Sequence, residues 1–263
     1  MKLFIKLFVV ILIVSAFLAS GIAGAASIDA KRLLLYWSCD DGKGDTLKDG
    51  SGRGFDGKLN GNFAWVKGQV NGAVELKTGY GMYKGNVIES TAKTGEITLA
   101  CWFMLNAHND YDGIISIASP LCEASCCYRL MINGSYNAFW NAGHHIDKTL
   151  GNFTFEKSKW YHCALTVDSK SGKIYVDGKF IGEQVENFKL PEFNDVTVFI
   201  GRGESASVHP AEDATIDDVT IWDKALGEKE LQAIMKPNFM AVVSMGKFAT
   251  TWAGLTIKPV FDA

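Results

Sequence analysis

Two acidic pairs, Asp40-Asp41 and Asp217-Asp218, lie far apart along the chain. Carboxylates and backbone carbonyl oxygens are the ligands that calcium takes in proteins. If folding brings the pairs together, oxygens from the glycine-rich stretch around Asp49 can complete an ion shell. The sequence thus predicts a structural Ca2+, with the candidate ligands Asp40, Asp49, Asp217 and Asp218. The alternative is that Asp217 caps a turn or pairs with a lysine.

Paired carboxylates are also the machinery of glycoside hydrolysis. A retaining glycosidase needs two of them about 5 Å apart across the sugar bond, which on a strand means residues two or four apart on one face. The acidic pairs here lie instead at the edges of expected elements or in loops: Asp40-Asp41, Glu212-Asp213 and Asp217-Asp218. No Gly-x-Ser-x-Gly or His-Glu-x-x-His motif occurs either. The residues therefore favour a protein that is not an enzyme.

Aromatic side chains stack on sugar rings, and the sequence has seven tryptophans. Trp140 lies in the alternating stretch YNAFWNAG, among alanines and asparagines. An indole between small residues leaves room above its ring for a ligand. The candidate ligand contacts are Tyr136, Trp140, Asn141 and His144. The competing interpretation is that Trp140 belongs to the core.

The first 25 residues have the pattern of a secretory signal peptide. Lys2 and Lys6 precede an apolar run at 7–18, and small residues follow up to Ala25. We expect cleavage near Ala25 and a mature protein that is secreted, extracellular or periplasmic and does not span a membrane. An uncleaved anchor is the alternative, but the apolar run is short for a full span.

Six cysteines in an exported chain predict disulfides. Cys101 and Cys163 each lie mid-strand in an apolar set, which predicts a bridge between them. Closing a loop of that length stabilises a fold by about 4 kcal/mol, before any strain is subtracted. Cys122 is expected to pair with Cys126 or Cys127, because adjacent cysteines bond each other only under strain.

Most of the mature chain reads as short strands rich in Val, Ile, Thr and aromatic residues. They are expected at 33–39, 72–76, 96–105, 113–119, 128–134, 136–143, 159–168, 173–182, 195–201 and 214–223. One helix is expected at 226–235, before Pro237. The pattern indicates an all-β fold. A net charge of −3 without a basic stripe argues against nucleic acid as a partner.

Four segments resemble the laminin G-like, or concanavalin A-like, jelly-roll superfamily. They are YWSCDDGKGDTLKDGSGRGFDGKLNG (36–61), KGQVNGAVELKTG (67–79), WYHCALTVDSKSGKIYVDGKFIG (160–182) and IDDVTIWDKALGEKELQAIM (216–235). The resemblance implies a two-sheet antiparallel β-sandwich with a short C-terminal helix over 27–236. The tail 237–263 is left without a role. The fold hosts lectins, adhesion modules, glycanases and lyases.

The resemblance also bears on cysteines and calcium. Pentraxins carry cysteines in the strands matching those of Cys101 and Cys163, which again implies a bridge. Their calcium ligands should fall near 125–127 and 203–207, where this sequence has cysteines and only Glu204. A calcium site of pentraxin type is therefore not expected. In such jelly rolls the first and last strands are neighbours, which would bring Asp40 near Asp217.

Taken together, the sequence predicts a secreted, non-catalytic module that binds carbohydrate or an extracellular surface partner. It is expected to require no cofactor, and structural calcium is a candidate ion. A structural or protein-adhesion domain without a sugar site is one alternative. A glycan-cleaving hydrolase or lyase is the other, and its mark would be two carboxylates that face a shared cleft.

Overall fold

The computed structural model describes residues 28–108, 111–119, 128–135, 137–142, 147–185, 195–203, 209–237 and 239–240, and only the backbone of 137–142 and 147–152. The predicted signal peptide, the tail beyond residue 240, the cysteines at 122, 126 and 127, and the candidates Tyr136 and His144 lie outside the described residues.

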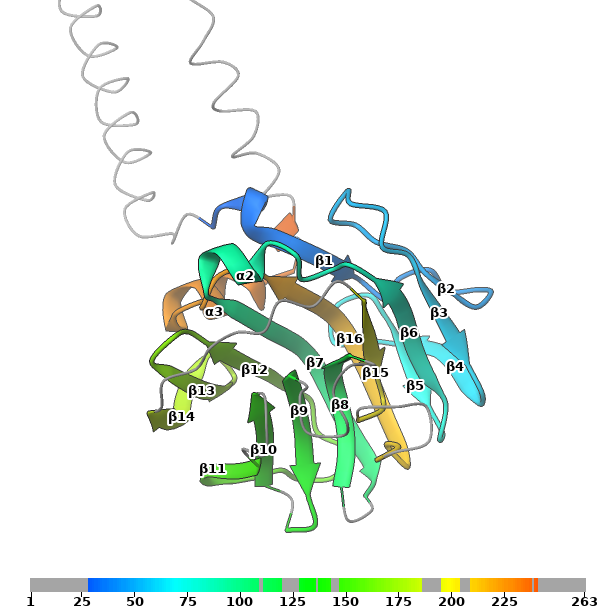
Figure 1. Ribbon diagram of the computed structural model, residues 1–263. Coiled ribbons are helices and arrows are strands. Elements are labelled where there is room, and N and C mark those ends of the chain that lie inside the picture. Colours follow the sequence, from blue (N-terminus) through cyan, green and yellow to red (C-terminus); the bar gives the residue numbers. More distant parts are fainter. Residues whose placement is uncertain are drawn as a thin grey trace, which may run out of the picture.

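Two antiparallel sheets pack face to face, which confirms the predicted β-sandwich (Figure 1). Sheet 1 has the order β14-β13-β12-β7-β16-β5-β4, and β1 also pairs with β16. Its strands are β1 (Leu33–Trp37), β4 (Phe63–Lys67), β5 (Gly72–Leu76), β7 (Ile97–Ala107), β12 (Tyr161–Val167), β13 (Ser171–Val176), β14 (Lys179–Val185) and β16 (Asp213–Trp222).

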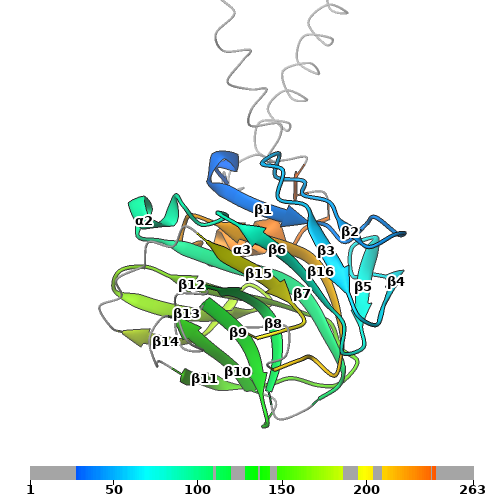
Figure 2. The ribbon, with the colours of Figure 1, turned by 45° about the vertical axis from the view of Figure 1, so that its right-hand side comes forward.

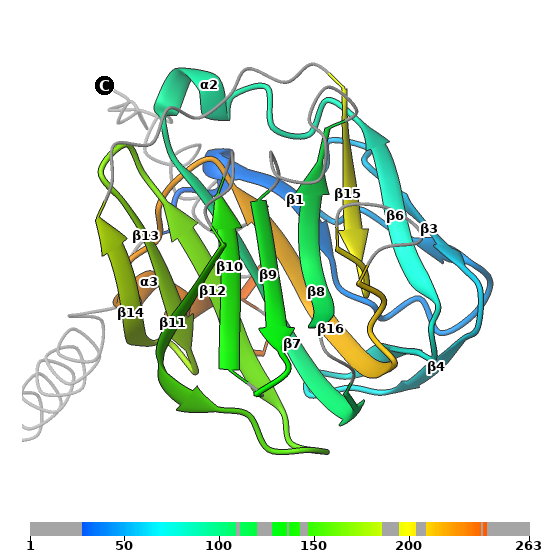
Figure 3. The same ribbon diagram turned by 60° about the horizontal axis from the view of Figure 1, so that its bottom comes forward.

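Sheet 2 has the order β11-β10-β9-β8-β15-β6-β3-β2, and Figure 3 looks onto it. Its strands are β2 (Thr46–Leu47), β3 (Gly57–Asn60), β6 (Tyr80–Gly85), β8 (Tyr111–Ala118), β9 (Tyr128–Asn133), β10 (Asn137–Ala142), β11 (Asp147–Thr154) and β15 (Val196–Ile200). The short helices are η1 (Ala30–Arg32), α2 (Thr91–Thr94) and α3 (Glu228–Ile234).

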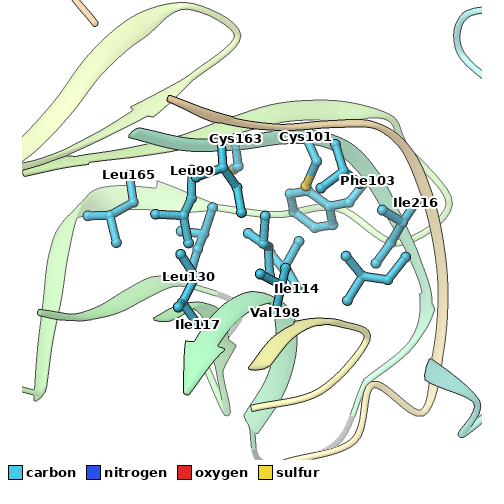
Figure 4. Close-up of a cluster of buried hydrophobic side chains, with 14 of the residues drawn as sticks. Leu99, Cys101, Phe103, Ile114, Ile117, Leu130, Cys163, Leu165, Val198 and Ile216 are labelled. Carbon is cyan, nitrogen blue, oxygen red and sulfur yellow. The ribbon is translucent and has the colours of Figure 1, made fainter. Parts of the chain in front are cut away.

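The main core fills the space between the sheets. Alternate residues of β7, such as Leu99 and Phe103, point into it from sheet 1, and Leu130 and Val198 meet them from sheet 2 (Figure 4). Burying such side chains stabilises the fold by about 1.5–3 kcal/mol each. Both faces of β7 are buried, as the sequence predicted for that strand.

Helix α3 covers the outer face of sheet 1 (Figure 2). Leu231 and Ile234 on the helix pack against Ala100, Ala164 and Trp222, which are the outward residues of β7, β12 and β16. The helix begins at Glu228, where Glu230 accepts a hydrogen bond from the N–H of Gly227 at 3.2 Å. It ends shortly before Pro237, as expected.

The first and last strands of the domain are neighbours, as the resemblance implied. β1 pairs antiparallel with β16, with Trp37 opposite Val219. Within the described part of the chain, no helix combines the length and the apolar character needed to cross a membrane.

Candidate functional site

A β-bulge in β16 places the two aspartates of the pair 217–218 on the outer side of sheet 1. The register with β7 shifts between Asp217 and Thr220. Ile216 and Val219 both lie in the core, so the two residues between them are directed away from it. Asp218 has a φ of 50°, in the left-handed region that few non-glycine residues occupy.

Asp217 is fully buried, yet one of its carboxylate oxygens is unpartnered. Oδ2 accepts a hydrogen bond from the backbone N–H of Val70 at 2.9 Å. Oδ1 is buried and accepts no hydrogen bond. A buried acceptor in this condition is destabilising by about 1–3 kcal/mol, and more when charged. The position therefore calls for a proton, a water molecule or a cation.

Two further carboxylates approach Asp217. Asp218 is nearly buried, and its Oδ1 accepts a hydrogen bond from the hydroxyl of Tyr36 at 2.6 Å. Asp40 is exposed, and its Oδ1 accepts the N–H of Gly72 at 2.8 Å. The predicted approach of Asp40 to the acidic pair of β16 is thus present in the fold.

Glycines let the loop between β4 and β5 close over this acidic cluster, which we define as Asp40, Asp217 and Asp218. A Cβ atom on Gly68 would lie 2.1 Å from the carbonyl oxygen of Gly72 and 2.6 Å from Oδ2 of Asp217. Only glycine fits at such a distance, so the loop backbone can lie directly against Asp217, to which Val70 donates its N–H.

The electrostatics of the acidic cluster disfavour negative charge. Burial raises the pKa of Asp217 to about 8, and the neighbouring carboxylates Asp218 and Asp40 add to the effect against the hydrogen bond from Val70. Burial raises the pKa of Asp218 to about 6, against the opposing hydrogen bond from Tyr36. A cation bound here would relieve the repulsion and occupy the unpartnered oxygen.

The geometry only partly fits the predicted ion. Among the described residues no three His, Cys, Asp or Glu side chains converge as a complete ligand set. An ion would therefore depend on backbone oxygens as well, which calcium accepts as ligands. Calcium at the acidic cluster remains a proposal.

Asp49 does not belong to this cluster, which corrects the predicted ligand set. Its Oδ1 accepts the N–H groups of Tyr36 and Ser51, and its Oδ2 accepts the N–H of Phe55 and the hydroxyl of Ser51. With four hydrogen bonds, this carboxylate organises the loop that follows β1.

Cys101 and Cys163 are directly opposite each other on β7 and β12, in the register that the sequence predicted (Figure 4). Both are buried in the main core as free thiols, and Cys39 is a third buried thiol. The disulfide itself is not formed in the structure and stays a prediction. Burial raises the pKa of all three thiols, which suppresses their reactivity.

The register of β10 argues against Trp140 as a surface platform for sugars. Position 140 is opposite Leu130 of β9, and position 141 is opposite Arg129. Cross-strand partners share one face of a sheet, and Leu130 lies in the main core. Position 140 therefore belongs to the inward row of sheet 2. Of the two predicted contacts whose backbone is described, only Asn141 occupies the outward row.

The outer face of sheet 2 carries a different aromatic group, which the sequence reasoning missed. Phe199 and Ala118 are buried there against the half-buried Tyr80 and Met82. The rings of Tyr80 and Phe199 are 6.1 Å apart, and the guanidinium of Arg202 lies 5.0 Å from the centre of the Tyr80 ring. We call these five residues the Tyr80 patch. The alternation of Tyr80 and Met82 in YGMYK was the signal that could have indicated it.

Comparison with known proteins agrees with this architecture. Residues 78–232 match the laminin G type 3 family, described as the concanavalin A-like lectin/glucanases superfamily. No curated protein sequence gives a significant match.

Among solved structures, the fold is similar to domain 4 of an extracellular GH43 arabinanase from Geobacillus stearothermophilus, in complex with arabinotriose. The TM-score is 0.63 at 15% identity, over 78% of this chain and 98% of that one. A botulinum neurotoxin DC binding domain in complex with rat synaptotagmin II gives a TM-score of 0.60 at 17% identity, over 82% and 52% of the two chains.

A sialidase from Trypanosoma rangeli gives a TM-score of 0.59 at 18% identity, over 80% of this chain and 33% of that one. This chain therefore spans about half of the neurotoxin domain and a third of the sialidase. At these identities the similarity shows the fold alone.

Proposed function

We propose that this chain, which belongs to the concanavalin A-like lectin/glucanase superfamily, is an exported, non-catalytic module that binds carbohydrate on the outer face of sheet 2. The observation that carries the proposal is the Tyr80 patch. It combines a half-buried aromatic ring, a thioether and a guanidinium on the regular surface of a sheet. An aromatic ring with polar neighbours offers a ligand both an apolar face and hydrogen-bonding groups.

The similar structures support this proposal by analogy. The arabinanase domain has nearly the same extent as this fold, and it was solved with an arabinose trisaccharide. The neurotoxin domain was solved with a protein, which supports the alternative of a protein-adhesion domain. That alternative predicts that Tyr80 has no role in sugar binding.

The acidic cluster favours a structural role over glycan cleavage. Asp217 is buried beneath the loop between β4 and β5, and Asp218 is held by Tyr36. These two carboxylates are neighbours on one strand rather than groups on opposite sides of an open cleft, which is what a glycosidase requires.

The test is a glycan array probed with the purified protein and with the variants Tyr80→Ala and Phe180→Ala. Phe180 is a matched control, because it is an exposed aromatic residue (48%) on β14 of the other sheet. We expect selective binding that Tyr80→Ala weakens at least tenfold and Phe180→Ala leaves unchanged. Each bound glycan is then incubated with the protein and checked for new reducing ends, and none is expected.

A folded protein that binds no glycan on the array would contradict the proposal and favour the adhesion alternative. Release of new reducing ends from a bound glycan would instead establish the enzymatic alternative.

A further inference from the structure

Arg202, just beyond the end of β15, is held on several sides. Its Nη2 donates a hydrogen bond to the carbonyl oxygen of Thr78 at 2.5 Å, and its guanidinium lies over the ring of Tyr80. The hydroxyl of Ser116 lies 3.2 Å from the carbonyl oxygen of Arg202 and also contacts the carbonyl oxygen of Gly203, and it donates its single proton to one of the two. Both the backbone and the side chain are therefore fixed before any ligand arrives.

Gly113 on β8 lies directly beneath the backbone of Arg202 and leaves room for it. A Cβ atom on Gly113 would lie 2.1 Å from the carbonyl carbon of Arg202, so no larger residue fits there. The absence of that side chain lets the segment after β15 lie directly on β8. The guanidinium is thereby positioned on the outer face of sheet 2 beside the aromatic residues.

One N–H donor of this guanidinium has no hydrogen-bond acceptor among the described residues. Arg202 is only 9% exposed, and its Nε is buried without a hydrogen-bond partner. Its contacts with Thr78 and Tyr80 are with uncharged groups. An arginine stays charged in a protein, so this cation is largely withdrawn from water without an anion among the described residues.

Two lysines on the same face of sheet 2 are paired with aspartates. Lys58 pairs with Asp45 and Lys84 pairs with Asp195, both at 3.3 Å. Arg202 thus differs from these two lysines in having no carboxylate of the described chain beside it. An arginine fork binds a planar carboxylate through two parallel N–H groups.

We propose that Arg202 binds the carboxylate of an acidic sugar, so that the ligand of the Tyr80 patch is a carboxylated glycan. This inference rests on the proposed carbohydrate function. The carboxylate accepts hydrogen bonds from the N–H groups of the guanidinium, while Tyr80 and Met82 contact the apolar side of the sugar ring. The ligand supplies the negative charge that the described part of the site lacks.

The experiment compares probes that differ only in the carboxylate. Polygalacturonate is measured against its methyl ester, and sialyllactose against its carboxyl-reduced form, by calorimetry with the full protein. The variants are Arg202→Met, Arg202→Lys and the control Lys84→Gln, which removes a paired charge from the same face. The folding of each variant is checked by its melting curve.

We expect at least one acidic probe to bind tenfold or more tightly than its neutral partner, because charge-assisted paired hydrogen bonds are lost in the neutral form. Arg202→Met should abolish this preference, Arg202→Lys should reduce it, and Lys84→Gln should retain it. Equal binding of acidic and neutral probes would overturn the inference and leave the proposed function intact.

A preference that persists in Arg202→Met would overturn the assignment to this residue. Failure to bind any glycan, acidic or neutral, would contradict the proposed function itself. If Arg202→Met does not fold, the comparison of probes on the unmodified protein and on Arg202→Lys decides the matter.

Discussion

The fold strongly changes the pKa of the Asp217 carboxylate. It is buried with an unpartnered oxygen, and two other carboxylates lie nearby. Without a cation, its pKa of about 8 keeps it protonated at neutral pH. If calcium binds, Asp217 gives up this proton and ligates the ion as a carboxylate. The protonated state and the calcium-bound state can each be tested.

Replacing Asp217 by asparagine should change how stability depends on pH. The pKa is about 8 in the folded state and about 3.9 in an unfolded chain. Between these values the folded state holds a proton that the unfolded state releases, so the contribution of Asp217 to stability is lost as pH rises from 4 to 8. In chelator, Asp217→Asn should melt higher than the unmodified protein at pH 8, with the difference disappearing toward pH 4.

Asp45→Asn is the control for this measurement, since Asp45 is exposed and pairs with Lys58. It should show no such pH-dependent difference. A difference between Asp217→Asn and the unmodified protein that stays constant from pH 4 to pH 8 would show that the carboxylate does not titrate as described.

The two thiols on β7 and β12 give a second prediction at this scale. Cys101 and Cys163 are cross-strand partners in the core, and in an exported, oxidised chain we expect them to be joined. Peptide mapping without reduction should recover them as one linked peptide. Alkylation of either residue as a free thiol in the native exported protein would refute the bridge.

At the scale of elements, the sequence predicted most of the strands but missed five of those that the structure describes. The strands around Cys101, Cys163 and Asp217 have long apolar runs, and all were found close to their expected bounds. Missed were strands that are short, polar or rich in glycine: β2, β3, β4, β6 and β11. The stretch 173–182 proved to be a hairpin, because Asp177 and Gly178 both take positive φ and turn the chain.

The face of β10 shows why the sugar site could not be predicted from one strand. Alternation divides YNAFWNAG into two mixed sets, and neither set alone identifies the core. The pairing of position 140 with Leu130 decides it, and that register depends on a neighbouring strand. Arg202 was missed for a similar reason, because its partners Thr78, Tyr80 and Ser116 come from two other strands and a loop.

The register of β10 predicts opposite outcomes for neighbouring substitutions. Trp140→Ala should lower the free energy of unfolding by about 3–5 kcal/mol, as expected for an aromatic residue of the core. Asn141→Ala, in the outward row, should change it by less than about 0.5 kcal/mol. Urea denaturation measures both, and a stable Trp140→Ala protein that no longer binds sugar would restore the surface-platform hypothesis.

At the scale of the whole molecule, the acidic cluster joins the beginning and the end of the domain. Asp40 follows β1, Asp217 lies on β16, and the loop between β4 and β5 contacts both through Gly72 and Val70. An ion bound at this junction would stabilise only the folded chain, because the unfolded chain does not bring these groups together.

Calcium should therefore raise the melting temperature of the entire domain. At a concentration about 100 times Kd the expected gain is about 2.7 kcal/mol, measured as the shift between calcium and chelator. Asp217→Asn should lose most of this shift. Asp49→Asn, even if it lowers both melting temperatures, should retain the shift between calcium and chelator. Superimposable melting curves in calcium and in chelator would exclude the ion.

The pairing of β1 with β16 also delays the completion of sheet 1 during folding. β1 is the first strand to be synthesised, yet its partner, which carries Val219 opposite Trp37, is the last strand of the domain. Until β16 is available, sheet 1 has a gap between β7 and β5 and two unpaired edges beside it. Such long-range pairing slows folding, and unpaired edges invite aggregation and proteolysis. The chain is therefore exposed to aggregation and proteolysis until β16 has been synthesised and paired.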